Sequence, residues 1–224
     1  LPIIMGTTLG EVPLLEMIDK FWEKNGESDI YKSNVYGYPV FSMLNNVASF
    51  LEVKNLNYMI PSACASGNYT LGFASDLIKN NYSKIALAGC ADPFSKIAFL
   101  GFQRLFAMAS EKCQPFDKNR KGMLLGEGSA FFMLEEREHA LTRKAEIYAE
   151  ILGYGLSCDA SHMTMPSVSG IVACIEKAIK NANIRKQEIG YISAHGTGTP
   201  ANDKAECEAI KKVFGKDSEE VSIS

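Results

Sequence analysis

Cys64 is the residue whose setting most clearly indicates chemistry. It lies in the stretch IPSACASGNY, residues 60–69, where an apolar run gives way to small residues and then to a helical pattern. A thiol at the start of a helix feels the positive end of the helix dipole, which favours the reactive thiolate. Small neighbours also let a nucleophile project at a tight strand-to-helix turn. The local sequence leaves two interpretations open, a nucleophile and a buried small thiol.

A second candidate stretch is YISAHGTGTPANDKAE, residues 191–206. His195 follows an apolar strand pattern, at the end of a strand where α/β folds place residues that handle ligands. Thr197 and Thr199 offer hydroxyls at alternate positions, which suits the amides of an extended ligand arm. The run lacks the third glycine of a nucleotide-binding loop. A plain turn containing a histidine remains the alternative interpretation.

A third stretch, QPFDKNRKGMLLGEGSAFFMLEE, covers residues 114–136. It reads as a basic turn, a Gly-Glu-Gly bend and a strand. By itself this pattern favours a surface turn that leads into a strand.

Composition excludes several classes of protein. The formal net charge of −3 gives no indication of a nucleic-acid partner. No apolar run approaches the roughly 20 residues that span a bilayer, so no membrane association is expected. The six cysteines form no CxxC pair and no signal peptide precedes them. We therefore expect free thiols, a cytoplasmic location and no metal site.

The elements that must position these residues alternate between strand-like and helix-like patterns, which indicates an α/β protein with a mixed or parallel sheet. Strands are expected at residues 1–8, 57–62, 84–90, 129–135, 146–156 and 188–194. Helices are expected at residues 9–24, 38–52, 66–80, 136–145, 169–183 and 203–214. Cys64 would then lie at the turn of a βαβ unit, and Asp203 would cap the last helix.

Together, the three stretches resemble motifs of the β-ketoacyl synthases, condensing enzymes of the thiolase-like superfamily. The first matches the family block T-A-C-[AS]-[ST]-G and the second matches A-H-G-T-x-T-x-x-x-D-x-x-E. The third matches P-F-D-x-x-R-x-G-x-x-x-G-E-G, and residues 159–167 match D-A-x-H-x-T-x-P. The motifs occur in the family's order and at similar spacing, and the resemblance covers nearly the whole chain.

The resemblance implies a five-layer α/β/α/β/α fold made of two similar halves. Residues 1–145 would form the half that carries Cys64, with its first strand missing, and residues 146–224 would begin the half that carries His195. The implied reaction is a decarboxylative Claisen condensation in fatty-acid or polyketide synthesis. Cys64 would carry the acyl chain as a thioester, and its own N–H would form part of an oxyanion hole.

The resemblance also implies roles for other residues. His195 would donate a hydrogen bond to the malonyl thioester oxygen, and Thr197, Thr199 and Thr164 would hold the phosphopantetheine arm. Phe102 would line the acyl pocket, although an ordinary core phenylalanine is an equally open interpretation. Supporting positions are Lys204 and Glu206, in a polar network, together with Asp203.

The partners follow from the same resemblance. No cofactor is expected on the chain itself, because the acyl carrier protein brings the 4'-phosphopantetheine with its acyl and malonyl thioesters. Acyl carrier proteins are acidic, so a basic docking patch is expected. Its candidates are Lys96, Arg104, Lys118, Arg120 and Lys121. A homodimer is the expected assembly.

The chain also departs from the family pattern. The second catalytic histidine of the family lies in a G-H-x-x-G-A block that is not found here, so the chain looks truncated at both ends. We expect it to lack full condensing activity by itself. Two other hypotheses remain open: a thiol acyltransferase or hydrolase that uses Cys64 and His195, and a non-catalytic partner subunit of a condensing enzyme. A hydrolase needs an Asp or Asn to orient His195, whereas non-catalytic subunits typically lack the cysteine.

Overall fold

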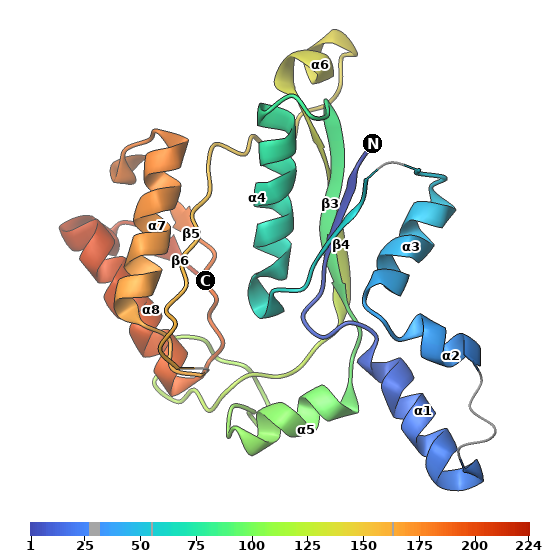
Figure 1. The fold of residues 1–224 in the computed structure, drawn as a ribbon. Coiled ribbons are helices and arrows are strands. Elements are labelled where there is room, and N and C mark those ends of the chain that lie inside the picture. Colours follow the sequence, from blue (N-terminus) through green and yellow to red (C-terminus); the bar gives the residue numbers. More distant parts are fainter. Residues whose placement is uncertain (27–31, 55, 163) are drawn as a thin grey trace. The chain divides into compact units, whose positions relative to one another are not determined.

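The computed structural model describes residues 1–26, 32–54, 56–162 and 164–224, and Figure 1 draws them as a ribbon. The chain separates into two compact units. Unit 1 comprises Leu1–Gly101 and Gly126–Ala149, and unit 2 comprises Phe102–Leu125 and Glu150–Ser224. The division into halves at residue 145 stays a prediction.

Unit 1 is built on a mixed sheet of four strands in the order β2-β1-β3-β4. The strands are β1 (Ile3–Gly6), β2 (Tyr58–Ile60), β3 (Ile85–Asp92) and β4 (Gly128–Glu135). β1 is parallel to both β2 and β3, and β4 is antiparallel to β3. All four correspond to strands predicted from the sequence, and the predicted mixed sheet is confirmed.

The alternation of side chains along β1 explains why helices cover both faces of this sheet. Ile3 and Met5 pack with buried residues of α3 (Phe41–Phe50). Ile4, between them, points to the other face and packs with Ala74 of α4 (Ser66–Lys79). Figure 1 shows α3 and α4 on opposite sides of the sheet. Unit 1 therefore has three layers, helix, sheet and helix.

The connection β2-α4-β3 is the predicted βαβ unit. β2 ends at Ile60, and a short 3₁₀ helix, η2 (Ala63–Ala65), leads directly into α4. The strand register pairs Gly6 at the end of β1 with Ile60 on one side and Cys90 on the other. Because parallel strands end at the same edge, the Cys64 turn lies at the carboxyl edge of the sheet.

Four further helices belong wholly or partly to unit 1: α1 (Val12–Asn25), α2 (Lys32–Gly37), α5 (Lys96–Arg104) and α6 (Arg137–Thr142). α5 falls in a segment that the sequence pattern indicated to be irregular. Its first turn is held by the Glu16 carboxylate of α1, which accepts from the Ile97 N–H at 2.9 Å and the Ser95 hydroxyl at 2.8 Å. This cap comes from about 80 residues away, so no local pattern could show it.

α6 is shorter than the predicted helix at residues 136–145, and an ion-pair cluster attaches it to β4. Glu135, at the end of β4, has a side chain only 8 % exposed. Its carboxylate accepts two hydrogen bonds from Arg143, at 2.8 and 2.6 Å, and contacts His139 Nδ1 at 2.5 Å. These hydrogen bonds lower the pKa of Glu135 to about 2, and the contribution from Arg143 is the largest.

Unit 2 contains the paired helices α7 (Val168–Ala182) and α8 (Pro200–Phe214), seen side by side in Figure 1. A two-stranded parallel sheet joins β5 (Tyr191–Ile192) to β6 (Ser222–Ile223). The predicted strand at residues 188–194 is thus much shorter than expected. Two 3₁₀ helices complete the unit, η3 (Lys186–Glu188) and η4 (Gly215–Glu219).

The prediction of a strand at residues 146–156 is wrong. None of these residues is in a strand, and in unit 2 residues 154–156 run along α7 instead. Side chains of α7 bind its backbone: Cys174 Sγ donates to the Gly155 carbonyl at 3.0 Å and Asn181 Nδ2 donates to the Tyr154 carbonyl at 2.8 Å. The residue pattern suits a strand, but a strand also needs a neighbour to complete its hydrogen bonds.

Within the described ranges, no helix is long and apolar enough to cross a membrane.

The Glu135 cluster predicts a pH-dependent stability difference. The folded pKa of about 2 lies below the ordinary value, so the ionised carboxylate stabilises the fold above that ordinary value. The stabilisation is lost as the pH falls from about 4.5 towards 2. We expect Glu135→Gln to lower the melting temperature at pH 7, and this difference to shrink across that acidic range. Thermal unfolding at a series of pH values measures it, and a difference independent of pH would contradict the assignment.

Candidate active site

Cys64 lies in the strained turn that connects β2 to α4. Ala63, which precedes it, has a φ of +48°, a left-handed conformation that is unfavourable for a residue with a Cβ. Cys64 itself is exposed, and its position in η2, two residues before α4, places it at the positive end of that helix. A strained, exposed position between a strand and a helix is typical of nucleophiles in α/β enzymes.

Ser66, the first residue of α4, holds this turn together. Its side chain is 1 % exposed, and its hydroxyl oxygen accepts the Ser62 N–H at 2.8 Å. The hydroxyl hydrogen faces the Ala63 carbonyl at 2.7 Å and the Thr7 carbonyl of the β1 loop at 2.8 Å. A Cβ at Gly6 would lie 2.9 Å from the Ser66 Cβ, so only glycine at this position lets the helix approach β1 so closely.

Asp92, at the end of β3, holds the loop after β1. Its carboxylate accepts from the Thr7 hydroxyl at 2.8 Å, the Thr8 N–H at 2.6 Å and the Thr8 hydroxyl at 2.9 Å. The carboxylate therefore fixes the β1 loop, and the Thr7 carbonyl in this loop binds Ser66. Neither Asp92 nor Ser66 was among the predicted site residues, although the position of Asp92, a polar residue at the end of a buried strand, is a signal that could have found it.

The Cys90 thiol lies 3.6 Å from the Asp92 carboxylate, and it is not activated. Burial first, and then the charge of Asp92, raise the pKa of Cys90 to about 11. Its thiol therefore stays protonated near neutral pH. This difference in setting separates Cys90 from the exposed Cys64.

The His195 loop of unit 2 is held by Glu206 of α8. The Glu206 carboxylate accepts the His195 N–H at 2.7 Å and the Gly196 N–H at 3.0 Å, and it also accepts from the Asn202 side chain at 3.2 Å. His195 is exposed. The predicted supporting position Glu206 therefore does contact the loop that carries the predicted catalytic histidine.

Thr197 and Thr199 lie together on the same loop, with their hydroxyls 2.8 Å apart. Between them, Gly198 has a φ of +73° and donates its N–H to Asp203 at 3.1 Å. Its carbonyl accepts the Gly122 N–H at 2.9 Å, and a Cβ on Gly198 would lie 2.6 Å from the Gly122 carbonyl oxygen. The glycine is required because two loops approach each other here.

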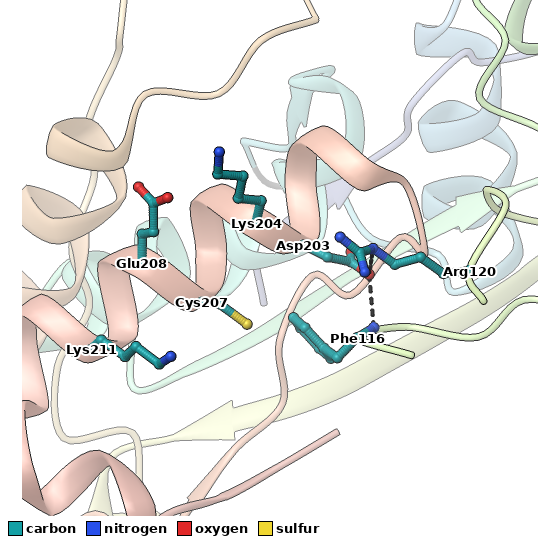
Figure 2. A pocket seen from close by; sticks show the side chains of 7 residues that line it. All are labelled: Phe116, Arg120, Asp203, Lys204, Cys207, Glu208 and Lys211. Atoms are coloured by element: carbon teal, nitrogen blue, oxygen red, sulfur yellow. Dashed lines mark hydrogen bonds and ion pairs between the residues drawn. The ribbon is translucent and has the colours of Figure 1, made fainter. Parts of the chain in front are cut away.

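Asp203 joins the loop of the third sequence stretch to the His195 loop. It is 1 % exposed, and its carboxylate accepts the Phe116 N–H at 2.8 Å as well as the Gly198 N–H. Arg120 Nε lies 3.4 Å from the same carboxylate, as Figure 2 shows. The Arg120 guanidinium also donates to the carbonyls of Asp117 and Pro200, at 3.0 and 3.5 Å.

The prediction that Asp203 caps the last helix is wrong. α8 begins three residues earlier, at Pro200, with Thr199 as the N-cap residue. Proline at the first position fixes the backbone for helix entry and needs no N–H partner. This leaves Asp203 inside the first turn, where it binds two loops.

A shallow depression of about 270 Å³ adjoins Asp203 on α8, and Figure 2 shows the side chains that line it. They are Phe116, Arg120, Asp203, Lys204, Cys207, Glu208 and Lys211. Its rim combines both signs of charge, and neither predicted catalytic residue lines it. Lys204 is exposed there, and its network with Glu206 stays a prediction.

Two further predicted site residues are Phe102 and Thr164. Phe102 is half-buried in α5, near the end of that helix. Thr164 is exposed, and its N–H donates to His162 Nδ1 at 3.1 Å. None of the six cysteines forms a disulfide. In the part of the chain that the structure describes, no group of three His, Cys, Asp or Glu residues is placed to hold a metal ion.

Two successive parts of the chain each match the model of a protein-family domain. Residues 3–140 match the N-terminal domain of β-ketoacyl synthases, and residues 148–224 match the C-terminal domain. The chain therefore belongs to the β-ketoacyl synthase family.

Relatives found by sequence comparison agree with this family. The 3-oxoacyl-[acyl-carrier-protein] synthase 2 of Synechocystis sp. is 34 % identical over 99 % of this chain and 56 % of its own length. Nodulation protein E of Rhizobium meliloti is 40 % identical over 80 % of this chain and 45 % of its own length. The chain thus spans about half the length of these relatives.

Solved structures confirm the fold. The ishigamide ketosynthase/chain length factor matches with a TM-score of 0.93 and 39 % identity, over 96 % of this chain and 54 % of the solved chain. A β-ketoacyl synthase from Burkholderia phymatum matches with a TM-score of 0.86 and 32 % identity, over 96 % of this chain and 54 % of the solved chain. The prediction of an incomplete thiolase-like α/β fold is therefore confirmed.

Removal of the Asp203 carboxylate should destabilise the protein strongly. Asp203→Ala leaves the largely buried Arg120 guanidinium without its anionic partner and two backbone N–H groups without their acceptor. We expect a loss of about 3–5 kcal/mol in the free energy of unfolding, measured by urea denaturation. The control is Lys84→Ala, which breaks the exposed pair with Glu136 and should cost less than about 1 kcal/mol. A loss no larger than the control's would contradict the role of Asp203.

The thiols at residues 64 and 90 should differ in reactivity. With iodoacetamide at pH 7–8, we expect mass spectrometry to find the label on Cys64 and little on Cys90, whose pKa is raised to about 11. Labelling of Cys90 in the folded protein should increase only as the pH approaches that value. Equal labelling at pH 7 would contradict the assigned environments.

Proposed function

We propose that the protein is a β-ketoacyl synthase that condenses an acyl thioester on Cys64 with a malonyl thioester carried by acyl carrier protein. The single observation that carries this proposal is the geometry of Cys64. It is exposed in a strained turn at the start of α4, on a chain that belongs to the family. The product is a β-ketoacyl thioester two carbons longer, in fatty-acid or polyketide synthesis.

In the first step the Cys64 thiolate attacks the carbonyl carbon of the acyl thioester. The bond to the carrier sulfur breaks, and the carrier leaves as a thiolate that takes up a proton. The N–H of Cys64 donates to the oxygen that becomes negative during this step. The dipole of α4 supports the thiolate, so Cys64 is activated by the dipole rather than mainly by an adjacent base.

In the second step the malonyl group loses CO2, and its two bonding electrons form an enolate. His195 donates a hydrogen bond to the thioester oxygen on which this charge develops. The enolate carbon attacks the acyl carbon, and the Cys64 thiolate is released. Glu206 positions His195 by holding its backbone N–H.

Substrate positioning falls to the remaining predicted residues. Thr197 and Thr199, whose hydroxyls lie together, and Thr164 hold the phosphopantetheine arm. Phe102 lines the acyl pocket, and Lys204 and Asp203 support the site. In this assignment residues 1–145 form the first thiolase-like half, and residues 146–224 begin the second.

The partners belong to the same proposal. A solved relative, a type II PKS ketosynthase in complex with its acyl-carrier protein, matches 99 % of this chain and 58 % of its own with a TM-score of 0.92 and 30 % identity. This match supports an acyl carrier protein as the partner and as the source of 4'-phosphopantetheine. We further propose a homodimer in the cytoplasm.

The side chains of Asn202 and Asp203 argue against a hydrolase. A Cys-His hydrolase needs an Asp or Asn that orients the histidine ring. Both oxygens of Asp203 accept backbone N–H groups, and Asn202 donates to Asp203 and Glu206. These residues are thus already used to hold the loops. The presence of Cys64 likewise argues against a non-catalytic subunit.

The proposal predicts separate effects of the two catalytic residues in the complete gene product. Cys64→Ala should abolish acyl transfer to the protein and the adduct with cerulenin, a fatty-acid-like thiol inhibitor. His195→Ala should leave acylation of Cys64 in place and lower condensation by about 100-fold or more, because only the second step uses the histidine. Mass spectrometry of the adduct and a condensation assay measure these effects.

His139→Gln is the matched control, since His139, on α6, binds Glu135 at the end of β4 and its replacement should affect neither step. Cerulenin labelling at another cysteine, with condensation retained in Cys64→Ala, would overturn the proposal. Hydrolysis of the acyl thioester without condensation would favour the hydrolase instead.

A further inference from the structure

The peptide bond between Ala63 and Cys64 determines where the Cys64 N–H points. This bond is trans, so its C=O and N–H point in opposite directions within one rigid plane. Whatever fixes the Ala63 carbonyl therefore fixes the direction of the Cys64 N–H. In the proposed reaction that N–H must meet the developing oxyanion.

Ser66 binds the Ala63 carbonyl twice. Its backbone N–H donates to this oxygen to close η2, and its hydroxyl lies 2.7 Å from the same oxygen. The backbone contact arises from the 3₁₀ turn itself, but the hydroxyl contact depends on the side chain. Because Ala63 has a left-handed φ of +48°, the turn requires such additional contacts to persist.

The Ser66 hydroxyl has one hydrogen and two lone pairs. It accepts the Ser62 N–H, and its hydrogen is shared between the carbonyls of Ala63 and Thr7 at nearly equal distances, 2.7 and 2.8 Å. One buried atom thus connects both sides of the Cys64 turn to the β1 loop. That loop is in turn held by Asp92 through Thr7 and Thr8.

We propose that Ser66 is a positioning residue that orients the Cys64 N–H for the acyl-transfer step, through its hydroxyl contact with the Ala63 carbonyl. This inference rests on the proposed function, because it assigns the N–H to the oxyanion of that reaction. The proposed function concerns the Cys64 thiol, whereas this inference states that a buried hydroxyl on α4 fixes the direction of the oxyanion donor. Ser66 does not touch the reacting atoms.

The test compares two reactions of the same thiol in the complete gene product. Transfer of an acyl group from a carrier thioester develops an oxyanion, whereas alkylation by iodoacetamide displaces iodide from a saturated carbon and develops none. We expect Ser66→Ala to slow acylation of Cys64 by about 10- to 100-fold. Alkylation of the same cysteine should change little.

Two variants and one control complete the test. Ser66→Thr keeps the hydroxyl and should restore most of the acylation rate, and Ser66→Cys, a weak donor, should fall between Thr and Ala. If Ser66→Ala does not fold, the acylation rates of Ser66→Thr and Ser66→Cys test the inference. Ser75→Ala makes the same change at another buried position of α4 and should leave both rates unchanged.

The outcomes separate the inference from the proposed function. Acylation and alkylation that fall by the same factor in Ser66→Ala would show a general loss of structure and overturn the inference. Unchanged acylation in Ser66→Ala, or acylation in Ser66→Thr as slow as in Ser66→Ala, would also overturn it. A wild-type protein that takes up no acyl group on Cys64 would instead refute the proposed function.

Discussion

Backbone N–H groups in the loops that follow the strands need acceptors, and carboxylates from distant elements supply them. Asp92 accepts from the loop after β1, and Glu206 and Asp203 accept from the loop that follows β5. A buried N–H without an acceptor is costly, so each carboxylate fixes the loop that it binds. The conformations of the β1 loop, which supports the Cys64 turn, and of the His195 loop depend on these hydrogen bonds.

The same constraint explains why the strained Cys64 turn persists. A left-handed alanine is unfavourable, yet the Ala63 carbonyl and the Ser62 N–H are both bound by Ser66. Strain at a nucleophile is maintained only where neighbouring contacts determine the backbone completely. The exposed thiol is therefore presented by a rigid and mostly buried support.

Acid-base properties follow from the same packing. Cys90 and Cys64 belong to one βαβ unit, but burial and Asp92 keep Cys90 protonated. Glu135 is held ionised by Arg143 and His139 and connects α6 to the edge strand of the sheet. Similar residue types thus have different chemistry because their surroundings differ.

Periodicity predicted the elements whose apolar pattern is visible in the local sequence. The four strands of unit 1, together with α4 and α7, were predicted with small errors at their ends, because their apolar patterns match the faces they bury. α5 was missed because its cap comes from Glu16 on another helix. The strand predicted at residues 146–156 is not formed, since a sequence pattern cannot supply the neighbouring strand that pairs with it.

The sequence by itself determined the family, the thiol at the start of a helix and the histidine loop, because their residue types and spacing are local in the chain. Only the tertiary structure decided which groups support them. The Asp92 carboxylate lies more than 80 residues from Thr7 in sequence, and Asp203 lies 87 residues from Phe116. Such contacts depend on how elements pack, so Ser66 and Asp92 acquire their roles only when β1, β3 and α4 meet at one edge of the sheet.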